Sequence, residues 1–267
     1  MTRAGGWCLD FGNNAMNEPS PSSTEPAARL SQIATIRDLP SSEIVQRYGK
    51  AIRRYLAALL KKPEDVDDVA QNIHVKILKG DLAKWDASRS RFRDFLKTVV
   101  RNAALDCHRQ SPKRSQDSAD LSRVADPHGA AATPENQIWI DLWREAVIAS
   151  VLAGIKAYQD QHPGNHFFTV VHLLEVDPEM GSEQLAAALT EHTGRACTAE
   201  NARQQKARVR GKFAALLVKE VMLTVPCQGP ESVEEELRTL RLFDYVEAYF
   251  TEAFKAALKE LKKEDSP

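Results

Sequence analysis

The sequence of 267 residues lacks several features that would assign its class at once. It has no run of the ~18 apolar residues that a membrane span needs, and its first residues, MTRAGGWCLD, lack the apolar core of a signal peptide. Its four cysteines are scattered, with no pair at metal-ligand spacing, which favours reduced thiols. We therefore expect a cytoplasmic protein without membrane insertion.

Motifs for catalysis or metal binding are equally scarce. The sequence has no Gly-rich phosphate loop and no metal-binding set of carboxylates. His162, His166 and His172 have irregular spacing and no accompanying cysteine, so they do not predict a zinc site. Cys107 and His108 lack the third member that an activated nucleophile requires. We expect no catalytic residue, no metal and no cofactor.

What is present is a globular composition with helical periodicity. The chain is 43% hydrophobic and 27% charged, and its length allows two domains with cores of their own. No stretch shows the period of a strand, whereas apolar residues recur at helical spacing over most of the chain. The sequence therefore predicts an all-α fold.

Charge is unevenly distributed, although the net charge is only −1. Residues 84–114 carry nine Lys or Arg against three Asp, a net charge of +6, and residues 195–219 carry seven against one Glu, again +6. Residues 231–267 carry ten acidic against six basic residues, a net charge of −4. Two basic islands and an acidic tail suggest two contacts with DNA and a separate face for another role.

Two amphipathic helices are predicted before the first island. The first follows Ser41 and Ser42, and the second begins at Pro63 and ends at Gly80. The apolar residues of the second helix step by three and four and are expected to face a core: Val66, Val69, Ile73 and Ile77. The residues left outside are Asp68, Gln71, Asn72 and Lys79.

The stretch Arg91–Gln110, RFRDFLKTVVRNAALDCHRQ, predicts the helix around which the chain is organised. Phe95 and Val99 are expected to hold it on the core, while Lys97, Arg101 and Asn102 lie on a solvent face suited to phosphates and bases. Residues 111–134 have no sustained period and read as a linker.

The second half predicts further helices, among them a helix-turn-helix. A helix from Pro134 is expected to bury one side that includes Ile138, Leu142 and Ala149, with Trp139 and Trp143 in the core. A small-residue helix, EQLAAALTEH, then precedes a cation-rich helix that Thr198 can cap. The expected organisation is a weakly ordered segment 1–40, a helical domain 41–110, a flexible linker 111–134, a helix-turn-helix domain 135–225 and an acidic helical extension 226–267. Met1 and Met16 both stay open as the start.

The two basic islands, in this order, resemble a bacterial RNA polymerase sigma factor of the extracytoplasmic-function branch. PEDVDDVAQNIHVKIL and FRDFLKTVVRNAALDCHR resemble region two, with the spacings F-R-x-F-L and R-N-x-x-x-D. SEQLAAALTEHTGRACTAENARQQKARVRGKFAALL resembles the region-four helix-turn-helix, and IWIDLWREAV and VEEELRTL resemble a planctomycete-like subgroup. His74 stands where the family has a buried apolar residue, and TEHTGRAC is longer than a tight helix-turn-helix turn.

The resemblance implies core RNA polymerase and promoter DNA as partners, with an anti-sigma factor or another regulator as a further candidate. The residues that it assigns to polymerase are Asp65, Asp68, Gln71 and Asn72. The residues that it and the basic faces assign to DNA are Arg91, Arg93, Lys97, Arg101, Asn102, Arg109, Thr198, Arg203, Gln204, Lys206, Arg208 and Arg210. The loop at 86–92 would hold an unstacked base.

Two other functions are compatible with the same residues. One is a helix-turn-helix regulator that binds DNA without engaging polymerase. The other is a helical interaction module whose basic faces bind an acidic protein. The acidic extension could fold back to restrain DNA binding, recruit a partner, or simply pack on the second domain through apolar residues such as Leu237 and Phe250.

Overall fold

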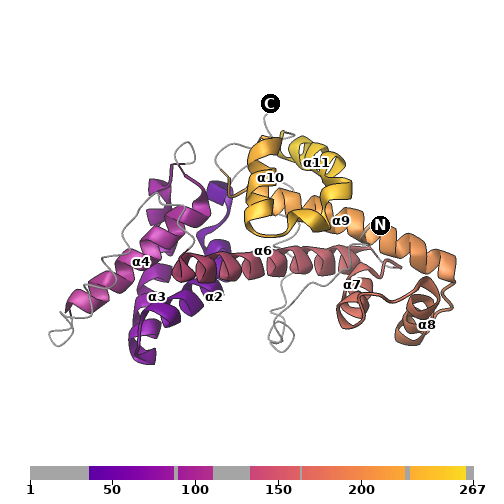
Figure 1. Cartoon of the computed structure of the whole chain (residues 1–267), viewed down its shortest axis with the longest axis horizontal. Coiled ribbons are helices and arrows are strands. Elements are labelled where there is room, and N and C mark those ends of the chain that lie inside the picture. The colour runs from indigo at the N-terminus through magenta and orange to yellow at the C-terminus, as the bar shows by residue number, and fades with distance from the viewer. Residues whose placement is uncertain (1–35, 87–89, 111–132, 163, 226–228, 263–267) are drawn as a thin grey trace. The chain divides into compact units, whose positions relative to one another are not determined.

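The computed structural model describes residues 36–86, 90–110, 133–162, 164–225 and 229–262. Within these residues the chain forms nine α-helices and no strand, with a few short 3-10 turns between them (Figure 1). The predicted all-α fold is therefore confirmed for this part of the chain. The predicted N-terminal segment up to residue 35 and the linker from 111 to 132 lie outside the described residues.

The described residues divide into two compact units. The first unit draws on Thr35–Val147 and Met222–Leu240, and the second on Ile148–Val221 and Arg241–Pro267. The sequence-based boundary at residue 135 falls thirteen positions before the start of the second unit's central segment, Ile148. The difference arises because the beginning of the helix from Pro134 packs with the first unit.

Helices α2 (Ser41–Leu59), α3 (Pro63–Leu78) and α4 (Phe92–Gln110) gather into the bundle of the first unit (Figure 1). Pro63 opens α3, where its missing N–H costs no hydrogen bond, and Gly80 follows the helix with a φ of 87°. All four residues predicted to face the core from α3 are buried. The sequence thus predicted correctly which face of α3 is buried and which face is exposed to solvent.

The first turns of α6 (Pro134–Gln161) complete this core with two tryptophans. Trp143 stacks on Tyr48 with ring centroids 4.4 Å apart, and Trp139 packs against Tyr55 at 4.9 Å. Both tryptophans are fully buried, as predicted. The expectation that Ile138 and Ala149 also face inward was wrong, because the stripe Trp139–Trp143–Val147 sets the register and leaves Ile138 42% exposed and Ala149 exposed.

Residues 222–240 return to the first unit through backbone hydrogen bonds and apolar contacts. The N–H of Ile36 donates to the carbonyl of Leu223 at 3.1 Å, and the N–H of Phe92 donates to that of Thr224 at 2.9 Å. Helix α10 (Pro230–Thr239) follows, and its residues Val233 and Leu237 are fully buried. The C-terminal extension thus contributes one of its helices to the core of the first unit.

The second unit holds the remaining helices: the rest of α6, α7 (Phe167–Val176), α8 (Ser182–Thr193), α9 (Ala199–Met222) and α11 (Phe250–Lys262). Its buried residues include Val170, Leu185, Val209 and Phe213. Lys219 of α9 donates to Glu260 of α11 at 2.8 Å, which ties α11 to the helix-turn-helix segment. The helical extension predicted after residue 226 therefore contains two α-helices in the described residues, and they belong to different units.

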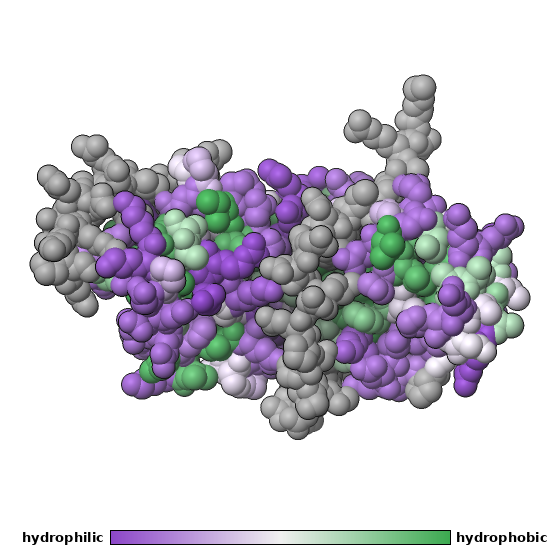
Figure 2. Space-filling view, turned by 90° about the horizontal axis from the view of Figure 1, so that it is seen from below, coloured by the Kyte–Doolittle hydropathy of each residue, from purple (hydrophilic) through white to green (hydrophobic). Residues whose placement is uncertain are grey.

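The surface seen in Figure 2 is mainly hydrophilic, and its hydrophobic residues form small separate patches. None of the helices in the described ranges is long and apolar enough to cross a membrane.

Candidate functional site

Helix α3 presents a polar stripe to solvent. Asp68, Gln71 and Asn72 are all exposed, as their spacing predicted, whereas Asp65 is half-buried and has an interaction partner. Asp67 lies off this stripe and accepts a hydrogen bond from Arg53 of α2 at 2.8 Å. Three of the four residues assigned to polymerase therefore share one accessible face.

Two large apolar residues continue this stripe towards the end of α3. Val75 is 40% exposed and Leu78 is 54% exposed, and both lie a whole number of turns beyond Asp68 and Gln71. The interpretation of the sequence missed them, although they fall outside the buried register that it identified. An accessible surface that mixes polar side chains with large apolar ones is typical of a protein–protein contact. We call the five residues Asp68, Gln71, Asn72, Val75 and Leu78 the α3 stripe.

His74 of α3 lies beside Gly49 of α2. A Cβ atom at Gly49 of α2 would lie 3.1 Å from its Nε2 atom, so the imidazole occupies space that the glycine leaves open. Burial lowers the pKa of His74, and Nε2 is a buried atom with no hydrogen-bond partner in the described structure. The departure from an apolar residue at this position is thus accommodated by a neutral histidine against Gly49.

Helix α4 packs in a register slightly different from the predicted one. Its buried apolar residues are Phe92, Leu96, Val100 and Ala104, whereas Phe95 and Val99 are only half-buried. The register brings Arg93 into the core, turns Asn102 and Arg109 to solvent, and leaves Lys97 and Arg101 half-buried. Arg109 forms an exposed ion pair with Asp106, at 3.5 Å.

The two arginines at the start of α4 are bound by acidic residues of α10. Arg93 donates from Nε to Glu236 Oε1 at 2.8 Å and from Nη2 to Oε2 at 3.1 Å, and both side chains are at most 4% exposed. Arg91 pairs with Glu235 at 2.9 Å and with Glu236 at 3.3 Å. Burial disfavours the charge of Arg93, but Glu236 outweighs this effect and raises the guanidinium pKa.

The next two cations of α4 contact the first turn of α6. Lys97 donates to Asn136 Oδ1 at 3.0 Å, and Arg101 lies 3.6 Å from Glu135. Glu135 also accepts a 2.6 Å hydrogen bond from the hydroxyl of Tyr55. Burial lowers the pKa of Lys97, while burial and the neighbouring Glu135 raise that of Tyr55. Of the six α4-region residues assigned to DNA, four are therefore engaged by residues of α6 or α10.

The loop before α4 is anchored by a buried tryptophan. Trp85 packs edge-on against Phe92, with ring centroids 5.4 Å apart, and its indole Nε1 donates to the carbonyl of Ser90 at 3.0 Å. The central residues of the predicted base-holding loop, 87–89, lie outside the described ranges.

The helix-turn-helix of the second unit is formed by α8 and α9. Gly194 ends α8 with a φ of 67°, which a glycine adopts without strain, and Thr198 accepts a hydrogen bond from the N–H of Asn201 at 3.2 Å at the start of α9. Part of the long segment TEHTGRAC belongs to α8, so the turn itself is 194–198. The hydroxyl of Thr190 accepts the N–H of Cys197 at 2.9 Å, which fixes this turn.

The predicted DNA-binding residues of α9 are unequally accessible. Arg203, Gln204 and Arg208 are exposed, as is Thr198 just before the helix. Lys206 donates to the carbonyl of Met180 at 3.0 Å, and Arg210 is half-buried and has an interaction partner. Arg203 pairs with Glu200 of the same helix at 2.6 Å.

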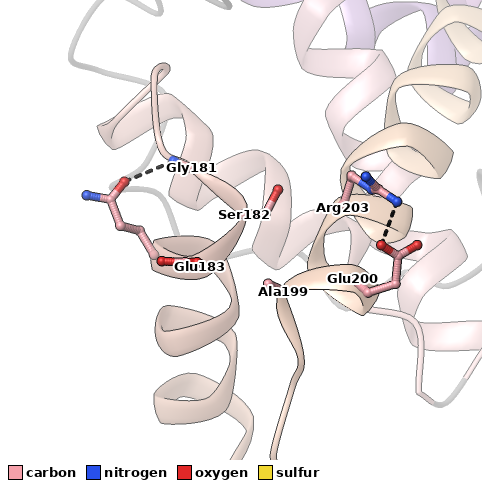
Figure 3. A pocket seen from close by; sticks show the side chains of 7 residues that line it. Gly181, Ser182, Glu183, Ala199, Glu200 and Arg203 are labelled. Carbon is pink, nitrogen blue, oxygen red and sulfur yellow. Dashed lines mark hydrogen bonds and ion pairs between the residues drawn. The ribbon is translucent and has the colours of Figure 1, made fainter.

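Two grooves flank these side chains. The first, of about 570 Å³, lies between the starts of α8 and α9 and is lined by Glu183, Glu200 and Arg203, so its charge is mixed (Figure 3). The second, of about 230 Å³, is lined by two arginines, Arg195 and Arg208, and by no acidic residue of the described part of the chain. Asn201 and Gln204 also line it. The sequence interpretation did not include Arg195 or Asn201, although Arg195 lies in the second basic island.

No group of metal-ligating side chains occurs in the described parts of the chain. Residues 44–114 match the family model of Sigma-70 region 2. Neither a curated protein nor a solved structure matches the chain. The match covers α2, α3 and α4 with the α3 stripe, and it ends before α6 and α10.

Proposed function

We propose that this chain, a sigma factor that binds core RNA polymerase and directs promoter recognition, docks on the polymerase through the α3 stripe. The observation that carries this proposal is the accessible row Asp68, Gln71 and Asn72, which lies within the matched segment and continues into Val75 and Leu78. The apolar pair would supply buried area, and the polar residues would fix the orientation. A sigma factor is not itself an enzyme, because phosphodiester chemistry belongs to the polymerase.

The test of this docking surface is the substitution Asp68→Arg. The matched control is Asp67→Arg, the same change of charge one position away, on a residue that faces Arg53 instead. Asp68→Arg should abolish co-purification with core polymerase, whereas Asp67→Arg should retain it. Equal binding by the two variants would exclude the α3 stripe as the docking surface.

We propose further that the two basic islands contact two promoter elements. Asn102 and Arg109 on α4 are accessible to the downstream element, and Arg203, Gln204 and Arg208 on α9 to the upstream one. Support for the second contact comes from the helix-turn-helix geometry of α8 and α9 and from the basic groove beside Arg208. This arrangement corresponds to regions two and four of an extracytoplasmic-function sigma factor.

Run-off transcription with purified core polymerase on a library of promoter fragments tests this two-part recognition. Transcripts should depend on two separated DNA elements. Dependence on the downstream element alone would leave the second unit without the proposed role. The planctomycete-like subgroup, a cytoplasmic location and control by an anti-sigma factor are further parts of the same proposal, supported by the motifs quoted above.

A further inference from the structure

The acidic helix α10 lies against Arg91 and Arg93, two cations that the sequence resemblance and the basic faces assign to DNA. Glu235 and Glu236 bind Arg91, and Glu236 binds Arg93 through both of its oxygens. Carboxylates and phosphates are alternative partners for the same guanidinium groups, because both are anions that accept paired N–H bonds. A phosphate therefore cannot bind Arg93 while Glu236 holds it.

The buried carboxylate that holds Arg93 comes from α10 and not from α4 itself. Asp94, within the segment that matches Sigma-70 region 2, lies 3.3 Å from the Arg93 guanidinium, but its side chain is 50% exposed. The buried carboxylate comes instead from a helix 143 residues further along the chain. Apolar residues of α10, Val233 and Leu237, are fully buried, so the helix is docked by packing as well as by charge.

We infer that α10 is an intramolecular competitor of DNA, which holds Arg91 and Arg93 of the free sigma factor in a closed arrangement. Promoter DNA gains these two arginines only when the carboxylates of α10 release them. The inference rests on the proposed contact between α4 and the promoter. In the free protein, the acidic extension then restrains DNA binding. The ion pairs of Arg91 and Arg93 with α10 are the contacts that form the closed arrangement.

The most direct test is the substitution Glu235→Gln in the full chain. The carboxylate of Glu235 contacts Arg91, but its side chain is 70% exposed, so the change leaves the buried core intact. Glu234→Gln is the matched control, because Glu234 lies on the same helix and pairs with Arg238 of α10 rather than with α4. Both variants lose one negative charge, but only Glu235→Gln loses a contact with Arg91.

The readout is the affinity of the free protein for a labelled promoter duplex over a range of salt concentrations. Glu235→Gln removes the shorter of the two contacts between Arg91 and α10 and leaves the 3.3 Å contact with Glu236. This variant should bind about threefold more tightly or better at low salt, with a logarithmic salt slope steeper by about one unit for the cation that DNA gains. Adding Arg91→Ala to this variant should remove the gain. Identical affinity and slope for Glu235→Gln and Glu234→Gln would overturn the inference, as would a gain that persists without Arg91.

Run-off transcription by the same variants separates this inference from the proposed function. If the wild-type chain with core polymerase produces no promoter-dependent transcript, the proposed function itself fails. If it produces transcripts while Glu235→Gln and Glu234→Gln bind DNA equally as free proteins, the closed arrangement alone is refuted.

Discussion

The carboxylate of Glu236 and the guanidinium of Arg93 form a two-bond ion pair inside the first unit, with N–O distances of 2.8 and 3.1 Å. Their side chains are 1% and 4% exposed. Each charge is removed from water and depends on the other, since a buried charge without a partner is strongly unfavourable. The C-terminal extension and the start of α4 are therefore coupled energetically.

Replacing Glu236 by Gln should destabilise the first unit. The change leaves the Arg93 charge buried without its anion, and breaking one side of a buried ion pair costs roughly 3–5 kcal/mol. Three of the four tryptophans, Trp85, Trp139 and Trp143, are buried in this unit, so urea unfolding followed by tryptophan fluorescence reports on it.

The substitution Glu234→Gln, at a partly exposed position of the same helix, is the control and should change stability by no more than about 0.5 kcal/mol. Equal unfolding midpoints for the two variants would mean that the ion pair contributes nothing to the stability of the first unit. A double variant, Arg93→Met with Glu236→Met, should recover much of the loss, because it removes both charges.

The local pattern of the sequence was sufficient to predict the faces of α3. Its apolar residues step by three and four without interruption, and the stripe opposite them is polar at Asp68, Gln71 and Asn72. The same reasoning failed for α6, where Ile138 and Trp139 are both apolar and both faces offer a plausible core. The larger tryptophan decided the register by packing with Tyr55.

The surroundings of α4 could not be predicted from periodicity. A cationic residue next to an apolar stripe predicts a solvent face only if nothing else covers it. Arg93 is covered by Glu236, which lies 143 positions away, and Lys97 by Asn136 across the segment 111–132. The net charge of −4 in residues 231–267 pointed to an acidic segment opposite in charge to the basic islands, but it did not identify Glu235 and Glu236 as the residues involved.

His74 should make the first unit sensitive to acid. Burial lowers its pKa below the ordinary value near 6.5, so the unfolded chain binds a proton at a pH where the folded chain does not. The free energy of unfolding then has its full value above about pH 6.5 and decreases as the pH falls below 6.5. His74→Leu should reduce this loss in unfolding experiments at pH 7 and pH 5.

The control for the acid effect is His192→Leu, which changes an exposed histidine on α8 of the second unit. Its tryptophan-detected stability should show the same pH dependence as the wild type. If His74→Leu also retains the wild-type dependence, the acid sensitivity of the first unit comes from other groups.

The apolar end of the α3 stripe should contribute to polymerase binding. Val75→Ser and Leu78→Ser remove apolar area that is accessible in the free protein, so they should weaken binding while leaving the fold stable. A contact residue whose truncation costs about 1.4 kcal/mol lowers affinity about tenfold. Titration of labelled core polymerase with each variant measures this loss.

Ile138→Ser is the matched control for the apolar pair. Ile138 is 42% exposed, close to the 40% of Val75, but it lies on α6 outside the segment that matches Sigma-70 region 2. It should bind polymerase as the wild type does. Equal weakening by all three serine variants would indicate a general effect of surface hydrophobicity rather than a contact on α3.

The basic groove of the second unit should bind the upstream promoter element through Arg208. Arg208 is exposed beside Arg195, and no acidic residue among those described lines this groove, whereas Arg203 is paired with Glu200 in the other groove. An arginine that contacts a phosphate changes the logarithmic salt slope by about one unit, and one that reads a base pair discriminates by about 1–3 kcal/mol. Arg208→Ala should therefore weaken upstream binding more than Arg203→Ala.

The measurement is binding of the polymerase complex to promoters that differ only in the upstream element. Lys259→Ala controls for loss of one positive charge, because Lys259 is exposed on α11 of the same unit and lines neither groove. A uniform loss across sequences with Arg208→Ala would assign Arg208 to the backbone, and relaxed preference at one base pair would assign it to base readout. If Arg203→Ala has the larger effect, the mixed groove is the DNA-binding one, and the ion pair with Glu200 must open when DNA binds.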